Sequence, residues 1–303
     1  MYEELEAYAM KKVLVAGATG YLGKYVALEF KRSGYYVRVL ARDPEKLNNK
    51  GNYLEPPIGD IVDDVFTGEV TKPETLEGIF DDIDIVFSSI GITRQKDDVT
   101  FMDVDYQGNK NLLDLAKGAS MKKFIFVSVF QAEMLNHIEI VKAREKFVED
   151  LSRSGLGYTI IRPTGYFSDM TQYFKMAHSG RAYLLGKGKC KMNPIYGMDL
   201  ATVCVKAVNR EQSDISIGGP YVYTHEEIAE LAFYVLKKRP KIFRIPNGFM
   251  NILLKVIYPF NKHMHSLLSF LSASMQMDLI APKTGSHGLK QYYQQYVRRK
   301  MKK

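Results

Sequence analysis

The stretch from Val13 to Gly23, V-L-V-A-G-A-T-G-Y-L-G, constrains the fold most strongly, because an apolar strand runs into a glycine turn that opens a helix. Gly17 permits a tight turn with positive φ, Gly20 lets the backbone approach a pyrophosphate, and Gly23 allows the helix to pack closely on the strand. The helix start supplies N–H donors and the positive end of its dipole. The context predicts a dinucleotide-binding turn made of Gly17, Thr19, Gly20, Tyr21, Leu22 and Gly23.

Strand and helix patterns alternate over the first 165 residues, which is typical of a parallel sheet covered on both faces. We expect strands near 12–17, 36–41, 65–67, 84–90, 123–129 and 158–162, and helices near 21–33, 74–80, 98–118 and 137–154. Beyond them we expect a helix at 166–179, a hairpin at 180–189, and helices at 199–209 and 224–237, the last capped by Thr224. The predicted fold class is α/β, a doubly wound Rossmann sheet with a smaller, mainly helical C-terminal lobe for the substrate.

The predicted domains follow from this pattern. Residues 1–9 form an acidic extension without the features of a secretory signal, and Met10 is an alternative native start. Residues 10–165 form the NAD(P)-binding domain, and 166–303 form the lobe, interleaved with the last sheet strands. The chain closes on a basic tail over 290–303, a composition that is often disordered.

Further segments follow the turn in a characteristic order: A-R-D-P-E-K-L at 41–47, G-E-V at 68–70, I-V-F-S-S-I-G at 85–91, V-D-Y-Q-G-N-K-N-L-L at 104–113, V-K-A-R-E at 141–145 and I-I-R-P-T-G-Y-F at 160–167. Together with the GxxGxxG spacing of the turn, this order resembles the atypical short-chain dehydrogenase/reductase superfamily. The resemblance covers about 200 residues. It is strongest to the subgroup of NmrA-like proteins, isoflavone-reductase-like enzymes, divinyl chlorophyllide reductase and photosystem assembly factors.

The resemblance implies where a cofactor would lie. Gly68, Glu69 and Val70 would border the adenine, with Glu69 in place of a family Asp. Ser88, Ser89, Ile90 and Gly91 would line the ribose and nicotinamide side, and the segment with Pro163 and Thr164 would lie beside the nicotinamide. Cofactor choice depends on the end of the second strand, where Ala41 and Arg42 replace the acidic residue that binds the ribose of NAD. Arg42 and Lys46 therefore favour NADP, although both would also suit a solvated surface.

The catalytic residues of the family pattern are only partly present in this sequence. Many family members use Y-x-x-x-K with an upstream Ser, and here Lys142 matches the lysine whereas Ile138 stands at the tyrosine position. Lys142 would act as a general acid or base, or would hold the nicotinamide ribose. Ser128 is the upstream candidate, and Tyr166 is a candidate substitute proton donor, with a structural role as its alternative. The spacing of His and Cys residues predicts no metal site.

Charge is distributed unevenly along the chain. Residues 1–150 contain 19 Lys and Arg against 26 Asp and Glu, a net charge of −7, whereas residues 151–303 contain 23 against 8, a net charge of +15. The basic half suits an anionic partner or a solvated face. Residues 247–271 form two apolar-rich helical pieces broken at Pro259, which would pack on the lobe or, with the basic tail, lie on a membrane surface. No nucleic-acid-binding motif is present, so no nucleic acid is expected.

Two functions remain open from the sequence. The first is an NADPH-dependent oxidoreductase that transfers hydride to a hydrophobic carbonyl or alkene substrate, neutral or anionic. The second is a non-catalytic NADP(H)-binding sensor or assembly factor; epimerase and dehydratase chemistry need the missing tyrosine even more. Two cysteines, Cys190 and Cys204, are too few for a disulfide framework and favour a reducing, cytoplasmic location, either free or peripheral on the inner face of a membrane.

Overall fold

Strands and helices alternate along the chain in the computed structural model, which describes residues 10–92, 99–119 and 121–300. The first elements are β1 (Lys12–Ala16), α2 (Tyr21–Arg32), β2 (Tyr36–Ala41), α3 (Glu45–Asn48), β3 (Asp64–Thr67), η1 (Pro73–Leu76), β4 (Ile85–Ser88), η2 (Met102–Gly108), α4 (Asn109–Gly118), β5 (Lys123–Val127), α5 (Ala132–Leu135), α6 (Glu139–Ser152) and β6 (Gly157–Pro163). They are followed by α7 (Phe167–His178), β7 (Ala182–Leu185), β8 (Lys191–Met192), α8 (Gly197–Lys206), η3 (Ala207–Asn209), β9 (Ser213–Ile217), β10 (Tyr223–Thr224), α9 (His225–Val235), β11 (Ile242–Ile245), α10 (Asn247–Ile257), α11 (Lys262–Ser274) and α12 (Leu289–Lys300).

A parallel sheet positions the site. Within the described residues, seven strands form it in the order β3-β2-β1-β4-β5-β6-β9, and each neighbouring pair is parallel. The strand order reverses between β1 and β4, which is the point where ligands bind beyond the carboxyl ends of such sheets. This confirms the predicted doubly wound fold, and β9 is the sheet strand expected among the lobe elements, at a position that the sequence pattern did not give.

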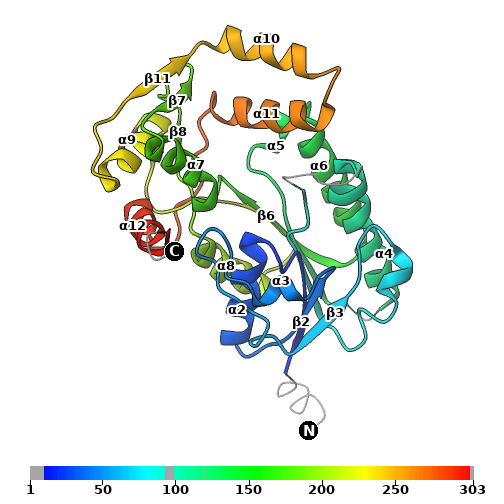
Figure 1. Ribbon diagram of the computed structural model, residues 1–303. Helices are drawn as coiled ribbons and strands as arrows, with labels where there is room; N and C mark the ends of the chain where they lie inside the picture. The colour runs from blue at the N-terminus through cyan, green and yellow to red at the C-terminus, as the bar shows by residue number, and fades with distance from the viewer. Residues whose placement is uncertain (1–9, 93–98, 120, 301–303) are drawn as a thin grey trace.

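Helices cover both faces of the sheet (Figure 1). The alternation of side chains along β1 separates two cores: Val13 and Val15 pack toward α2 and α8, whereas Leu14 and Ala16 belong to the core beneath α4 and α6. All four side chains are fully buried. The carboxyl ends of the strands point to the upper part of Figure 1, where α7, α10 and α11 lie.

The lobe, by which we mean α7, β7, β8, β10, α9, β11, α10, α11 and α12, has a core rich in tyrosine. The tail helix α12 buries Tyr292, Tyr293 and Tyr296 in it, so the expectation of a disordered basic tail is wrong for residues up to 300. With Leu289 and Val297 they follow helical spacing in the sequence and form one face of α12 against the lobe. The Tyr292 hydroxyl donates to the Tyr53 carbonyl at 3.2 Å, and Arg299 donates to the Gly51 carbonyl.

The predicted hairpin at 180–189 is also wrong. β7 pairs with β11 in parallel, and β8 pairs with β10 in antiparallel, so both strands find partners far away in the sequence. The cap at Thr224 is confirmed, because its hydroxyl accepts from the Glu227 N–H at 3.1 Å while the Glu227 carboxylate accepts from the Thr224 N–H at 2.7 Å.

One predicted helix in the first half is shorter than expected. The helix near 74–80 is only the 3₁₀ turn η1, which is followed by Gly78 at φ +76°. The helix at 98–118 is confirmed over 101–118, where the π-helical turn η2 continues into α4, and its expected first residue lies outside the described residues. The two pieces around Pro259 are α10 and α11. In the parts of the chain that the structure describes, no helix has both the length and the apolar character to cross a bilayer.

Candidate functional site

The glycine turn after β1 leaves no room for side chains at two positions. Gly17 adopts φ +89°, and a Cβ there would lie 2.9 Å from the Ser89 hydroxyl oxygen. A Cβ on Gly23 would overlap the Gly17 carbonyl, so the first turn of α2 packs directly on the end of β1. Gly20 caps α2 without a side-chain hydrogen bond, and the first turn carries no acidic residue. A helix start without its own capping side chain or negative charge suits a pyrophosphate, so the residues fit a dinucleotide.

The remaining residues of the turn differ in their surroundings. Thr19 is exposed, whereas Leu22 is buried in the core of the sheet. Tyr21 connects the turn to other elements: its hydroxyl accepts from the Gly197 N–H at 3.0 Å, and its ring centroid lies 5.9 Å from that of Tyr166. The aromatic ring of Tyr21 therefore joins the turn to the start of α8 and to the segment after β6.

Cationic side chains gather beyond the end of β2, as the sequence predicts. Arg42 Nη1 lies 3.5 Å from Glu69 Oε1, and Lys46 Nζ lies 3.2 Å from Asp43 Oδ2. Lys24 is buried in α2 and donates to the Lys46 carbonyl at 2.9 Å, which fixes α3 beside the glycine turn. The side chains of Arg42 and Lys46 are both 63% exposed, so an incoming phosphate would reach them.

Glu69 is ionised beside Arg42. Partial burial favours the neutral form, but hydrogen bonds from Lys72 and Thr71 and the charges of Lys72 and Arg42 outweigh it, so the pKa of Glu69 lies below its ordinary value. Gly68 stands just before it, where a Cβ would lie 2.8 Å from the Thr75 carbonyl. A 2′-phosphate on Arg42 would therefore share the guanidinium with Glu69.

Amide side chains of α4 hold the loops after β3 and β4. Asn111 Nδ2 donates to the Val70 carbonyl at 2.7 Å, and the Ser88 hydroxyl donates to Asn109 Oδ1 at 2.5 Å. Ser88 is fully buried, and Ile90 is buried as well. Ser89 is half-buried against Gly17, so Ser89 and Gly91 are the residues of this segment that remain accessible to a ligand.

A buried ion pair that the sequence analysis did not single out lies against Gly91. Arg144 Nε donates to Asp105 Oδ1 at 2.9 Å, and Asp105 Oδ2 accepts from the Ile92 N–H at 3.0 Å. A Cβ on Gly91 would overlap both Arg144 Nη2 and Asp105 Oδ1. Burial raises the pKa of Asp105, and the charge of Arg144 opposes this shift. Arg144 belongs to V-K-A-R-E, but its partner is 39 residues away, so spacing alone gave no signal.

Lys142 and Tyr166 stand on two different elements at this edge. Lys142 is exposed in the first turn of α6, four residues after the buried Ile138. Tyr166 precedes α7, and burial raises its pKa above the ordinary value while the charge of Arg144 lowers it. The positive charge of Arg144 therefore favours the ionised form of the Tyr166 hydroxyl, against the effect of burial.

Ser128 is committed to a polar network. Its hydroxyl donates to Glu145 Oε1 at 2.5 Å, and Arg162 holds both oxygens of Glu145 at 2.8 Å. Two aromatic residues that would block a substrate, Phe130 and Phe167, are instead buried in the core of the lobe. The side chains that remain at this edge of the sheet are therefore the polar ones described above.

The end of β6 is held by backbone partners. Pro163 is buried, and the Thr164 hydroxyl donates to the Asn193 carbonyl at 2.7 Å. The Thr164 N–H donates to the Ile217 carbonyl at 3.1 Å, which extends the pairing of β6 with β9. These contacts fix the turn at Gly165 and thereby the position of Tyr166.

His263 of α11 is a second residue that no sequence motif indicates. Its ring stacks on Phe101 with centroids 4.6 Å apart, and both ring nitrogens are buried without a hydrogen-bond partner in the described chain. Burial lowers the pKa of His263, although the negative charges of Asp105 and Glu139 raise it in part. The imidazole is therefore neutral and lies within electrostatic range of the ion pair at Gly91.

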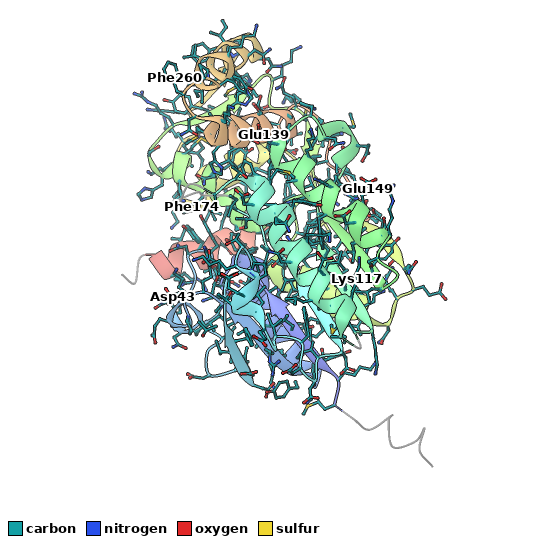
Figure 2. The ribbon with its side chains drawn as sticks, turned by 90° about the vertical axis from the view of Figure 1, so that its right-hand side faces the viewer. Asp43, Lys117, Glu139, Glu149, Phe174 and Phe260 are labelled. Atoms are coloured by element: carbon teal, nitrogen blue, oxygen red, sulfur yellow. The ribbon has the colours of Figure 1, made fainter. Side chains whose placement is uncertain are left out.

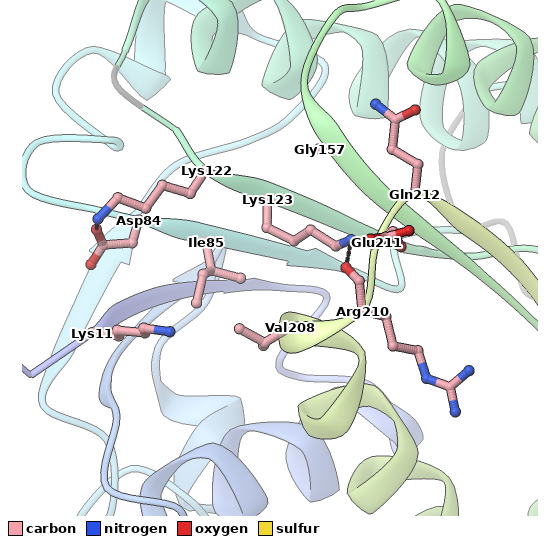
Figure 3. A pocket seen from close by; sticks show the side chains of 10 residues that line it. All are labelled: Lys11, Asp84, Ile85, Lys122, Lys123, Gly157, Val208, Arg210, Glu211 and Gln212. Carbon is pink, nitrogen blue, oxygen red and sulfur yellow. Dashed lines mark hydrogen bonds and ion pairs between the residues drawn. The ribbon is translucent and has the colours of Figure 1, made fainter. Parts of the chain in front are cut away.

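A hollow of about 230 Å³ lies at the opposite edge of the sheet, by the amino ends of β4, β5 and β6 (Figure 3). Lys123 crosses it and donates to the carbonyls of Tyr158 and Arg210 at 2.9 and 2.7 Å. Lys122 pairs with Asp84 at 3.2 Å. Ligands of doubly wound sheets bind at the carboxyl edge, so this hollow is separate from the candidate site.

Comparison with known proteins gives the same assignment. The model of the NAD(P)H-binding family matches residues 17–211. Divinyl chlorophyllide a 8-vinyl-reductase of Cucumis sativus is 29% identical over 261 residues, which are 81% of this chain and 62% of that protein. The chain thus spans about three fifths of the length of this relative. Photosystem II assembly factor Ycf39 of Trieres chinensis is 23% identical over 248 residues, 80% of this chain and 75% of that protein.

Solved structures share the fold at lower identity. An NADPH-dependent quinone oxidoreductase from Escherichia coli, in complex with NADPH, has a TM-score of 0.71 at 17% identity and covers 94% of this chain and 99% of its own. Triphenylmethane reductase of Citrobacter sp. has a TM-score of 0.72 at 16% identity, with 95% and 100% covered. The glycine cradle, the strand order and the family match together establish that the chain belongs to the NAD(P)H-binding family of Rossmann-fold proteins related to the short-chain dehydrogenases/reductases.

Proposed function

We propose that the protein is an NADPH-dependent oxidoreductase that transfers hydride to a hydrophobic carbonyl or alkene substrate, either neutral or anionic. One observation carries the proposal: the Arg144–Asp105 ion pair lies against Gly91, and the charge of Arg144 acts on the Tyr166 hydroxyl, while Phe130 and Phe167 are buried elsewhere. Polar groups at this edge would serve a reaction, whereas a binding protein would not need them. NADPH supplies the hydride when it is bound.

Each residue has a distinct part in the proposed reaction. Hydride addition to carbon needs a proton on the carbonyl oxygen, or on the neighbouring carbon of an alkene. Tyr166 holds a proton at neutral pH as any tyrosine does, and burial raises its pKa further. The Arg144 charge opposes that rise and would stabilise the tyrosinate that forms when the proton is donated. We assign to Lys142, in the first turn of α6, the role of holding ribose hydroxyls, and proton transfer is its alternative role.

NADPH is the proposed cofactor in preference to NADH. Support comes from Arg42 beyond β2, where an acidic residue would otherwise bind the ribose of NAD, and from Lys46 on the same side. Arg42 presents a guanidinium that grips phosphate through two parallel hydrogen bonds. Titration with NADPH and NADH, followed by cofactor fluorescence, tests this choice directly.

The names of related proteins support a conjugated, largely apolar substrate. They include a vinyl reductase of divinyl chlorophyllide, a quinone oxidoreductase and a triphenylmethane reductase. The acceptors in these names are unsaturated and extended, and the lobe that would cover such a substrate here is rich in aromatic residues. We therefore expect quinones and enones to be better acceptors than small sugars.

The deciding experiment follows NADPH oxidation by the purified chain with a panel of quinones and enones. We expect Lys142→Ala to lower kcat/KM about a hundredfold and Tyr166→Phe to lower kcat by a similar factor, as for loss of a general acid. Lys146→Ala is the matched control, since Lys146 is exposed on the same helix, one turn beyond Lys142. Tight NADPH binding without oxidation by any acceptor would refute the proposal.

A non-catalytic NADP(H)-binding sensor or assembly factor is the second candidate. The Ser128 hydroxyl is engaged by Glu145, Ile138 replaces the usual tyrosine, and assembly factors are among the relatives. In that case cofactor binding would be retained, turnover would be absent, and the Lys142→Ala and Tyr166→Phe variants would change only the affinity.

We further propose a reducing, cytoplasmic location. Cys190 and Cys204 are both free, and Cys204 is buried in the core of the sheet. A cell-fractionation experiment, with a thiol-labelling assay on the recovered protein, would find both thiols reduced.

A further inference from the structure

Helix α10 exposes its apolar side chains. The helix buries none of its eleven residues, all of which the structure describes. Phe249, Ile252 and Val256 lie at helical spacing on one side and are 58%, 63% and 57% exposed. An apolar helix in a globular protein normally buries such a stripe against a core. The stripe on α10 is therefore available to a partner.

The exposed apolar surface continues beyond α10 on both sides. Phe260, in the turn to α11, is 86% exposed and projects from the end of the molecule in Figure 2. On the other side, β11 leads into α10, and the exposed rings of Tyr183 and Phe243 stack with centroids 5.7 Å apart. We call this surface the apolar face, made of Tyr183, Phe243, Phe249, Ile252, Val256 and Phe260.

The charges around the apolar face have one sign. Residues 231–277 contain seven Lys and Arg and no Asp or Glu. Lys255 and Lys262 are exposed on α10 and at the start of α11, next to the apolar stripe. Exposed aromatic and aliphatic residues combined with cations are typical of helices that lie in the interface of a membrane with anionic lipids.

We propose that the apolar face docks the protein on the surface of an anionic lipid bilayer, with α10 lying in the plane of the interface. At 1.5 Å per residue, α10 would extend about 16 Å along the surface. A second copy of the chain fits less well, because a twofold contact would bring the same uniformly basic stretch against itself. The tail helix α12 takes no part, since its tyrosines are buried in the lobe.

Charge polarity supports the same orientation. The acidic residues 1–150 supply most of the sheet, and β2 and β3 lie in the lower part of Figure 1, away from α10 at the top. A negative membrane would attract the lobe and repel the far end of the sheet. Helix α11 lies between α10 and α6, and Ser266 Oγ accepts from the Ile140 N–H at 3.4 Å. The docked face is thus on the side of the reacting groups, although the proposal does not depend on catalysis.

The test is flotation of the full chain with vesicles of phosphatidylcholine alone or of phosphatidylcholine and phosphatidylglycerol at a 7:3 ratio. We expect binding to the anionic vesicles and at least tenfold weaker binding to the neutral ones. Ile252→Asp combined with Val256→Asp should reduce the partition coefficient at least tenfold. Tyr221→Gln, a change at an aromatic residue 51% exposed outside the face, should leave it unchanged.

A second pair of variants separates charge from apolar contact. Lys255→Gln with Lys262→Gln should lower binding to the anionic vesicles about fivefold, whereas Lys117→Gln, on α4 at the other end of the molecule, should not. Equal binding of the Ile252/Val256 variant and the unchanged chain would overturn the proposal. It would also be overturned if no vesicle retained the chain and light scattering showed a dimer that the Asp variants dissociate.

Discussion

The two halves of the candidate site are built from different parts of the chain. Around the glycine turn, the backbone forms the site, and Gly17 and Gly23 leave no space for a Cβ. Around Gly91, side chains from two separate elements form it: Arg144 of α6 and Asp105 of η2. The first half is fixed by the fold itself, whereas the second can change its chemistry while the fold is kept. Cofactor binding should therefore be the more general property and the reaction the more specific one.

The largest effect is expected in the backbone-built half. In Gly23→Ala, the new methyl group would overlap the Gly17 carbonyl, which cannot move without breaking the end of β1. We expect the free energy of unfolding to fall by roughly 4 kcal/mol in urea denaturation, with loss of NADPH binding. Gly118→Ala is the control, because nothing lies within 4 Å of a Cβ there. If Gly23→Ala left the free energy of unfolding unchanged, the backbone around the glycine turn would not be rigid as we infer.

The side-chain-built half should depend on its buried ion pair. Asp105→Ala leaves Arg144 with its charge unpaired, and breaking a buried pair in this way costs about 3 kcal/mol. NADPH affinity should change little, while kcat falls. Glu149→Ala, which removes an exposed pair with Arg153, should be nearly neutral. If Asp105→Ala abolished NADPH binding but retained turnover at saturating cofactor, the division into two halves would be wrong.

The lobe contains a buried histidine that adds a pH dependence of its own to the stability of the chain. Burial lowers the pKa of His225 to about 4, and its Nδ1 lies 2.7 Å from the Tyr173 hydroxyl. Between pH 6.5 and 4 the unfolded chain binds more protons at this site, so the free energy of unfolding falls as the pH falls, by at most about 3 kcal/mol. His225→Gln should flatten this part of the urea-denaturation profile, and His178→Gln, at an exposed site, should not.

The smallest effect concerns cofactor choice. Arg42→Ala should weaken NADPH binding about tenfold, or roughly 1.4 kcal/mol, because it removes one charge-assisted contact while Lys46 remains. NADH affinity should stay within twofold. Arg153→Ala, far from the site on α6, serves as the control. Equal loss of both cofactors would show that Arg42 supports the loop rather than the phosphate.

The sequence predicted what is local or belongs to the family pattern. The turn from Val13 to Gly23 contains strand, turn and helix start in eleven residues, so its structure follows from its own glycines. The position of Arg42 could be predicted from the end of β2 alone, and the cap at Thr224 could be predicted from the next three residues. The doubly wound parallel sheet followed from the alternation of strands and helices together with the resemblance, but the position of β9 and the order of the strands did not.

Features that depend on distant partners could not be predicted. β7 pairs with β11 about sixty residues later, whereas the glycines around 186–188 suggested a local hairpin. Arg144 contacts Asp105 only because η2 and α6 pack together. His263, which lies close enough for the charge of Asp105 to act on it, belongs to α11, much further along the chain. The tail helix is different, because its period was present in the sequence: Leu289, Tyr292, Tyr293, Tyr296 and Val297 follow helical spacing, and the prediction gave the basic composition more weight than this period.

The contact between α12 and the loop at 51–55 joins segments that lie far apart in the chain, and this separation bears on the order in which they fold. Tyr53 stands beside Tyr21 of the glycine turn, yet its carbonyl is held by a hydroxyl 239 residues later. Contacts of such sequence separation close slowly, because the intervening chain must first be ordered. The sheet would thus form well before α12 packs on the loop at 51–55. A refolding chain would therefore regain its core before it regains its full affinity for the cofactor.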